Sequence, residues 1–143
     1  MNDIQTILVE SEEKTRIALR VALRSQPGIE VASEATNGTT GLVLLESIDV
    51  DVAIVDAHLP DMSIREFIQQ MHDLQIEATV KPSRLLILLD PNEPAIIVQT
   101  LAMHVEGYCL KNASVEQMAA AIRQIDAGNS YIDLGIAKHL LSV

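Results

Sequence analysis

Residues 52–56 have the sequence VAIVD, in which four apolar residues are followed by Asp56. A short run that is apolar at every position predicts a strand in the centre of a parallel sheet, because helices cover both faces of such a strand. Asp56 is then expected at the C-terminal end of the strand, the edge at which open parallel sheets bind their ligands. Asp56 is therefore the first candidate functional residue.

Apolar runs of similar length occur on both sides of this one and alternate with longer amphipathic stretches. The runs predict strands at residues 6–9, 29–33, 52–55, 85–89 and 107–110. Helices are predicted at residues 12–25, from the Asn37-Gly38 turn to 47, and at 63–74, 94–104, 114–128 and 134–141. This alternation indicates an α/β fold, a doubly wound five-stranded parallel sheet with helices on both faces. We expect residues 1–128 to form one domain, and residues 129–143 to form a C-terminal extension that is a short helix.

Composition and charge limit the class of protein. The 143-residue chain is 48% hydrophobic but has no Trp, two Tyr and one Phe, so its core must be aliphatic. A formal net charge of −10 disfavours direct binding to nucleic acid, whose phosphates are also negative. The single cysteine, Cys109, cannot form an internal disulfide, which fits a reducing compartment. With no signal-peptide pattern, and no apolar stretch near the roughly 20 residues of a membrane helix, we expect a cytoplasmic protein with no membrane partner.

The residues at the ends of the predicted strands are candidates for a functional site. These residues are Glu10 and Ser11, Asp56, Leu89 and Asp90, and Lys111. Because parallel strands end at one edge of the sheet, we expect three carboxylates and one ammonium to converge there. Polar residues are also ordinary at strand ends, where the chain leaves the core, so topology alone does not establish a site.

Three segments together resemble the landmarks of bacterial response-regulator receiver domains. They are residues 7–11 (ILVES), 54–60 (IVDAHLP) and 107–114 (GYCLKNAS). The third segment, with residues 127–131 (AGNSY), is typical of the NarL/LuxR-type transcription regulators. The resemblance runs from residue 7 to residue 141 and implies the flavodoxin-like receiver fold, with strand order 2-1-3-4-5.

The resemblance also implies roles for individual residues. Asp56 matches the aspartate that accepts a phosphoryl group from a histidine kinase, and Lys111 matches the lysine that contacts this group. Tyr108 matches the aromatic switch residue, which we expect to be partly exposed on a binding face. The backbone carbonyl of His58, with Glu10 and Asp56, matches the ligands of Mg²⁺, which this chain is expected to bind only weakly.

Four positions depart from the family pattern. Ser11 replaces a metal-binding acid, and a neutral hydroxyl is a poor ligand for a hard cation. Leu89 replaces the switch Thr or Ser, so no hydroxyl is left to donate to a phosphoryl oxygen. Asp90 replaces a small residue and is expected to repel an incoming phosphoryl group. The alternative is that its carboxylate restores the metal-binding charge lost at Ser11. Ile64 replaces a glycine in the loop after Asp56.

These departures predict an atypical receiver domain, a signalling and protein–protein interaction module in which phosphorylation of Asp56 is weakened or lost. One alternative is a functional receiver that accepts a phosphoryl group on Asp56. Another is a phosphatase-like enzyme of the haloacid dehalogenase kind, but that chemistry requires an aspartate where His58 stands. A dinucleotide-binding enzyme requires a Gly-rich turn after the first strand, where residues 10–13 are ESEE. We therefore expect no enzyme.

The expected partners follow from the same resemblance. They are a histidine kinase or another signalling protein, and a second copy of the chain in a weak homodimer. For the dimer, the resemblance implies either the face of the fourth and fifth strands with their helices or the face of the first and fifth helices. The helix that begins near Ser114 offers two small residues for close contact, Ala120 and Ala121. Regulators of this type carry a DNA-binding domain that is absent from these 143 residues. The sequence leaves open whether the chain is a stand-alone module or a part of a longer transcription regulator.

Overall fold

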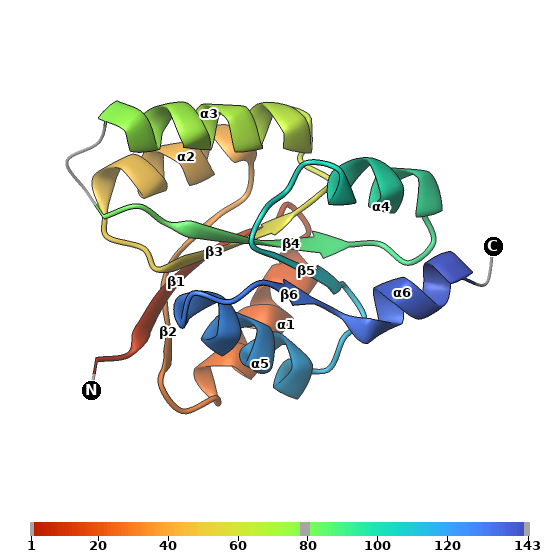
Figure 1. Ribbon diagram of the computed structural model, residues 1–143. Helices are drawn as coiled ribbons and strands as arrows, with labels where there is room; N and C mark the ends of the chain where they lie inside the picture. Colours follow the sequence, from red (N-terminus) through yellow and green to blue (C-terminus); the bar gives the residue numbers. More distant parts are fainter. Residues whose placement is uncertain (1, 78–80, 142–143) are drawn as a thin grey trace.

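The computed structural model describes residues 2–77 and 81–141, in which a parallel sheet lies between two layers of helices (Figure 1). The strands are β1 (Ile4–Val9), β2 (Ile29–Ala35), β3 (Val52–Asp56), β4 (Arg84–Leu89), β5 (Gly107–Leu110) and β6 (Tyr131–Ile132). The helices are α1 (Glu13–Arg24), α2 (Gly38–Ser47), α3 (Ile64–Glu77), α4 (Pro94–Leu101), α5 (Val115–Asp126) and α6 (Leu134–Leu141). The prediction of a doubly wound α/β fold is confirmed.

The sheet has the strand order β2-β1-β3-β4-β5-β6, and all of its pairs are parallel. All five residues of β3 are buried, as its apolar sequence predicts. Val55 lies beside Val9 of β1 on one side and Ile87 of β4 on the other. Asp56 is therefore fixed at the C-terminal end of a central strand.

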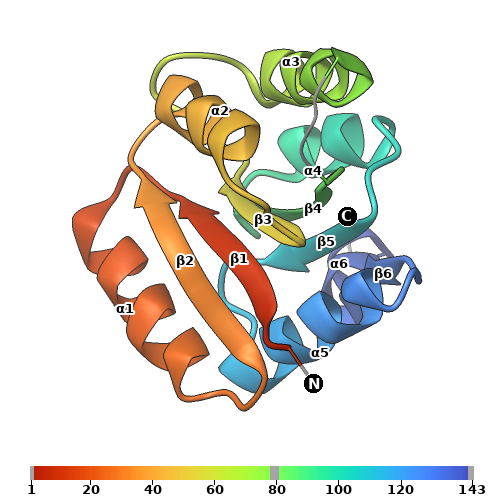
Figure 2. The ribbon, with the colours of Figure 1, turned by 90° about the vertical axis from the view of Figure 1, so that its left-hand side faces the viewer.

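Two helical layers cover the two faces of the sheet (Figure 2). Helices α2, α3 and α4 lie over one face, and α1 and α5 lie over the other. Alternate residues of each strand enter the two cores: Ile87 and Leu89 pack under the first layer, whereas Leu88 packs against the second. Both cores are mainly aliphatic, and Phe67 is fully buried in the first.

The exposed face of α5 is narrower than we predicted. Ala121 is fully buried against the sheet with Ile122 and Ile125, whereas Ala120 is exposed. Ala121 lies about one helical turn from both Met118 and Ile125, so it shares their buried face. It is therefore not available for a dimer contact.

The C-terminal part of the chain adds a sixth strand where five were predicted. The strand β6 has only two residues and pairs with the outer edge of β5, Gly107 with Tyr131 and Tyr108 with Ile132. A two-residue strand has no periodicity for sequence analysis to detect. The helix α6 has the predicted bounds, and Ile136 inserts into the core beside α4, with 1% of its surface exposed. Residues 142–143 of the predicted extension lie outside the described part.

A capping box holds the start of α5, next to the end of β5. The Ser114 hydroxyl accepts a hydrogen bond from the Gln117 N–H, and the Gln117 side chain accepts one from the Ser114 N–H. This arrangement satisfies two donors that a helix start would otherwise leave unpaired. It also fixes the short loop that carries Lys111. Across the described residues, no helix is long and apolar enough to cross a membrane.

Candidate functional site

Three charged residues meet beyond the C-terminal ends of the strands. Glu10 follows β1, Asp56 ends β3 and Lys111 follows β5. The Lys111 Nζ lies 2.7 Å from Asp56 Oδ2 and 3.1 Å from Glu10 Oε1. The carboxylate side chains are almost fully buried, with 2% of Glu10 and 3% of Asp56 exposed. The structure thus brings together three of the predicted site residues.

Burial and the contacts among the three side chains shift the pKa values of Glu10 and Lys111. Burial, together with the neighbouring Asp56, raises the pKa of Glu10 from 4.5 to about 7, although Lys111 opposes this effect. Apart from its contacts with Lys111 and Asp56, the Glu10 carboxylate has no hydrogen-bond partner among the residues that the structure describes. Burial lowers the pKa of Lys111, but the contacts with Asp56 and Glu10 outweigh it, so the net pKa is raised. The site therefore holds a firmly charged ammonium against two competing acids.

The loop after Asp56 is tied down at three points. The His58 N–H donates to Asp56 Oδ1 at 2.9 Å, and the exposed His58 ring contacts the carboxylate of Glu93 at the start of α4. Asp61 Oδ1 accepts from the Gly38 N–H at 2.8 Å, and Oδ2 accepts from the Thr39 N–H at 2.9 Å. Asp61 thereby caps α2 from a distant loop and fixes the segment that follows Asp56.

Sequence reasoning missed both Glu93 and Asp61. Asp61 follows Pro60 in a turn, which is a usual place for a capping aspartate, so a weak signal was available. Glu93 contacts a residue that is 35 positions away in the sequence, and no local pattern indicates such a pair.

The departures from the family pattern take different places around the cluster. Ser11 is exposed, whereas Leu89 is fully buried in the core under α2, α3 and α4. Ile64 is buried in the same core, so the larger side chain at this position has a packing role. Among the described residues, Lys111 pairs with Glu10 and Asp56, while the Asp90 carboxylate accepts from the Asn92 N–H. We expected Asp90 to converge with Glu10, Asp56 and Lys111. It instead accepts a hydrogen bond within a local turn and takes no part in these ion pairs.

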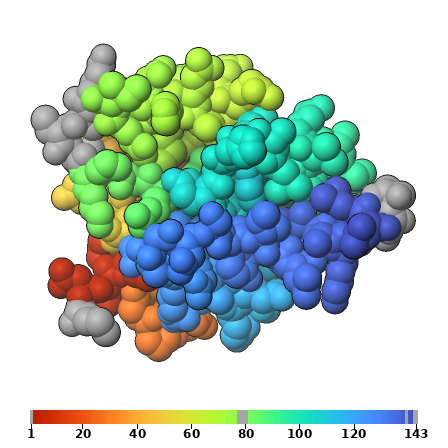
Figure 3. Space-filling view, viewed as in Figure 1, coloured from red at the N-terminus to blue at the C-terminus, as the bar shows by residue number. Residues whose placement is uncertain are grey.

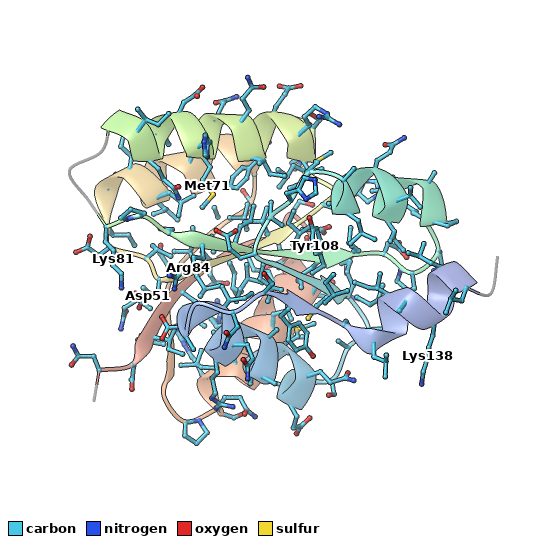
Figure 4. All side chains as sticks on the ribbon, in the orientation of Figure 1. Asp51, Met71, Lys81, Arg84, Tyr108 and Lys138 are labelled. Carbon is cyan, nitrogen blue, oxygen red and sulfur yellow. The ribbon has the colours of Figure 1, made fainter. Side chains whose placement is uncertain are left out.

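Tyr108 is buried, with 3% of its surface exposed, where we predicted partial exposure. Figure 4 shows its side chain between the sheet and α4. The hydroxyl donates to the Thr100 carbonyl at 3.2 Å and accepts from the Val105 N–H at 3.1 Å. Burial raises the pKa of Tyr108. The inward tyrosine thus fills the core under α4, and its hydroxyl ties the end of α4 to the segment before β5.

The buried carboxylates also bear on metal binding. Oxygen ligands suit a hard cation such as Mg²⁺, and among the described residues the Glu10 oxygens have no polar neighbour other than the Lys111 ammonium and Asp56, so Glu10, Asp56 and the His58 carbonyl fit such an ion in kind. Lys111 competes with the ion for both carboxylates. Within residues 2–77 and 81–141, no cluster of three or more His, Cys, Asp or Glu residues has the geometry of a metal site. The donor set is therefore sparse.

The comparisons with known proteins agree on one family. A family profile described as "Response regulator receiver domain" matches residues 6–123. The nitrate/nitrite response regulator NarL of Escherichia coli K12 is 26% identical over 122 residues, which cover 85% of this chain and 54% of NarL. The response regulator UvrY of the same strain is 28% identical over 137 residues, which cover 96% of this chain and 61% of UvrY.

A solved structure of the RcsB response regulator from Salmonella typhimurium has a TM-score of 0.85 at 20% identity and covers 99% of this chain and 67% of its own. At this identity the likeness concerns the fold. The chain spans about half of the length of NarL and about three-fifths of UvrY.

Proposed function

The chain belongs to the response regulator receiver domain family, with NarL and UvrY among its relatives, and on that premise we propose that it is an atypical receiver whose output does not depend wholly on phosphorylation of Asp56. It is a receiver domain of a two-component response regulator. The observation that carries the proposal is the missing chemistry of the pocket: Ser11 supplies no third carboxylate beside Glu10 and Asp56, and Leu89, fully buried in the core, supplies no hydroxyl.

The contacts of Asp56 are the first support. Its Oδ2 accepts from the Lys111 ammonium and its Oδ1 accepts from the His58 N–H, so both oxygens are engaged. An incoming phosphoryl group must either displace the Lys111 ammonium from Asp56 or bind this ammonium while it also contacts Glu10. When bound, Mg²⁺ supplies positive charge that screens the carboxylates and the phosphoryl oxygens. With Ser11 in place of a carboxylate, we infer that this ion is held weakly.

The residues between the pocket and Tyr108 are the second support. In the family the switch hydroxyl at the position of Leu89 connects the phosphoryl group to the aromatic residue. Here Leu89 is fully buried in an apolar core that also contains Tyr108. The Tyr108 hydroxyl already has partners at the end of α4. We infer that packing, rather than phosphorylation, sets the conformation of α4.

A functional phospho-receiver is the alternative, and the short Lys111–Asp56 contact favours it. The pair places an ammonium 2.7 Å from the candidate phosphoacceptor oxygen, where it can also contact a phosphoryl oxygen. In both readings the Asp56 pocket serves in signalling, and we propose no enzymatic turnover.

The decisive experiment is incubation with Mg²⁺ and acetyl phosphate, followed by intact-mass measurement. We expect little or no phosphoryl adduct on the wild-type chain, and a clear adduct on the double variant Ser11→Asp/Leu89→Thr. Asp56→Asn in the double-variant background is the control for the site of modification. A nearly complete wild-type adduct that Asp56→Asn abolishes would establish the functional phospho-receiver instead.

The partners are proposed on the same basis. We propose a histidine kinase or another signalling protein as the upstream partner, a cytoplasmic location, and a weak homodimer through α1 and α5. A related structure contains RcsB dimers bound to DNA, and we propose that this chain acts in a transcription regulator in which another domain contacts the DNA. Residues 1–128 form the receiver unit in this proposal, and residues 129–143 form an extension that returns to its edge through β6 and α6.

A further inference from the structure

The helices α2 and α3 lie side by side over the sheet, away from α1 and α5 (Figure 2). Between them is a cavity of about 350 Å³, hereafter the α2–α3 groove, lined by Leu42, Val43, Glu46, Asp73 and Leu74. Leu42 is 6% exposed and forms an apolar floor, whereas 54% of the Val43 surface is exposed at the wall. The groove therefore combines a place for an apolar side chain with two carboxylates.

The charges of the groove are unbalanced. Glu46 lies in the last turn of α2, and Asp73 lies one turn before the end of α3. Neither helix has a basic residue in its last turn. The C-terminal end of a helix carries partial negative charge, which acidic side chains reinforce and cations offset. Within the described residues, Glu46 and Asp73 take part in none of the ion pairs.

From this combination we propose that the α2–α3 groove binds a cationic amphipathic helix of a protein partner. An apolar side chain of that helix enters the cavity against Leu42 and Val43, and its Lys or Arg side chains contact Glu46 and Asp73. The cations then offset the negative ends of both α2 and α3. The surface is separate from the Asp56 pocket, so the proposal stands whether or not Asp56 is phosphorylated.

The probe is a fluorescent peptide of about 18 residues, long enough to form a helix, with leucines on one face and lysines on the other. We expect the full chain to bind it at micromolar concentration and to bind a matched glutamate peptide far more weakly. Glu46→Gln/Asp73→Asn should weaken lysine-peptide binding about tenfold, since two exposed charge pairs are lost. Val43→Ser should weaken it about threefold to fivefold through lost apolar contact.

Matched controls separate the groove from the general negative charge of the chain. Glu30→Gln/Glu116→Gln removes two exposed acids outside the groove, and Val98→Ser changes an exposed apolar residue of α4. Both control variants should bind as the wild type does, and amide shifts in NMR spectra should map to α2 and α3. Equal weakening by the two charge variants, no weakening by either, or no binding of the lysine peptide would each overturn the proposal.

The outer face of α1 carries Lys14 and Arg24 with the exposed Val21, so a second copy of the chain is the competing occupant. Sedimentation of the wild type and of Glu46→Gln/Asp73→Asn distinguishes the two. Self-association that the groove variant abolishes would assign the groove to a second copy and overturn the partner proposal. Self-association unaffected by the variant, together with the peptide results above, would support it.

Discussion

The ammonium of Lys111 lies 2.7 Å from the carboxylate of Asp56, although β4 separates their strands in the sheet. The same ammonium reaches Glu10, at the end of a third strand. A buried ion pair contributes little net stability, because removing its charges from water costs about as much as their attraction returns. Removing Lys111 from the ion pair should nonetheless destabilise the fold strongly, since the carboxylates of Asp56 and Glu10 would stay buried without a counter-charge. Lys111 therefore governs both the stability and the charge state of the pocket.

The stability of the chain should depend on pH through Glu10. Its pKa is about 7 in the folded chain against 4.5 as the reference for the unfolded chain, so the folded form binds the proton more tightly. The stabilising effect of protonation is fully present below pH 4.5 and is lost as the pH rises through 7. Urea unfolding should show the wild type losing up to about 3 kcal/mol relative to Glu10→Gln between pH 5 and 8. Glu30→Gln, at an exposed position, should follow the wild type. Parallel curves for wild type and Glu10→Gln would contradict the assignment.

Replacing Ser11 by Asp should tighten Mg²⁺ binding. A third carboxylate supplies the anionic oxygen that a hard cation prefers, and it helps the ion to compete with Lys111 for Glu10 and Asp56. Titration followed by NMR or calorimetry should give an affinity at least about tenfold above that of the wild type. Ser11→Asn is the neutral control and should leave the affinity nearly unchanged. If the wild type already binds Mg²⁺ as tightly as Ser11→Asp, the pocket is not deficient in charge.

The hydroxyl of Tyr108 should contribute measurably to stability. Tyr108→Phe leaves the Val105 N–H and the Thr100 carbonyl without this partner, so we expect a loss of about 1–2 kcal/mol in chemical denaturation. Tyr131→Phe is the control, because no hydrogen bond of the Tyr131 hydroxyl occurs among the described residues, and it should cost much less. Equal effects of the two variants would mean that the contacts of Tyr108 at the end of α4 contribute no specific stability.

The main strands could be predicted from the sequence because β3, β4 and β5 are buried on both faces and their residues are apolar nearly throughout. The meeting of Glu10, Asp56 and Lys111 could also be predicted, since parallel strands share one C-terminal edge. The strand β6 could not, because its formation depends on the free edge of β5. The inward position of Tyr108 and the local hydrogen bond of Asp90 depend on backbone groups whose places only the folded chain defines.

A weak homodimer should form through α1 and α5. On α1, Val21 is 63% exposed and Ile17 is 39% exposed, and α1 packs beside α5, where Ala120 is exposed. Helices α4 and α6 lie beside each other in Figure 3. Val98 of α4 is also exposed, at 57%. Val21→Asp should abolish self-association in sedimentation velocity at high concentration, and Val98→Asp should not. If both variants associate as the wild type does, neither face forms the interface; a monomeric wild type would remove the prediction.

Phosphorylation of Asp56, where it occurs, should be uncoupled from α4 and Tyr108. A hydroxyl at position 89 would donate a hydrogen bond to a charged phosphoryl oxygen, worth about 1.5–3 kcal/mol, whereas Leu89 donates none. A ligand shifts a conformational equilibrium only by the difference in its affinity for the two forms, and the missing bond removes that difference. With a phosphoryl mimic and Mg²⁺, we expect wild-type amide shifts confined to the loops around Asp56. Leu89→Thr should cost about 1–3 kcal/mol of stability through lost packing but should extend the shifts through α4 to Tyr108. Wild-type shifts that already extend to Tyr108 would contradict the prediction, because they would show that the pocket is coupled to α4 without a hydroxyl at position 89.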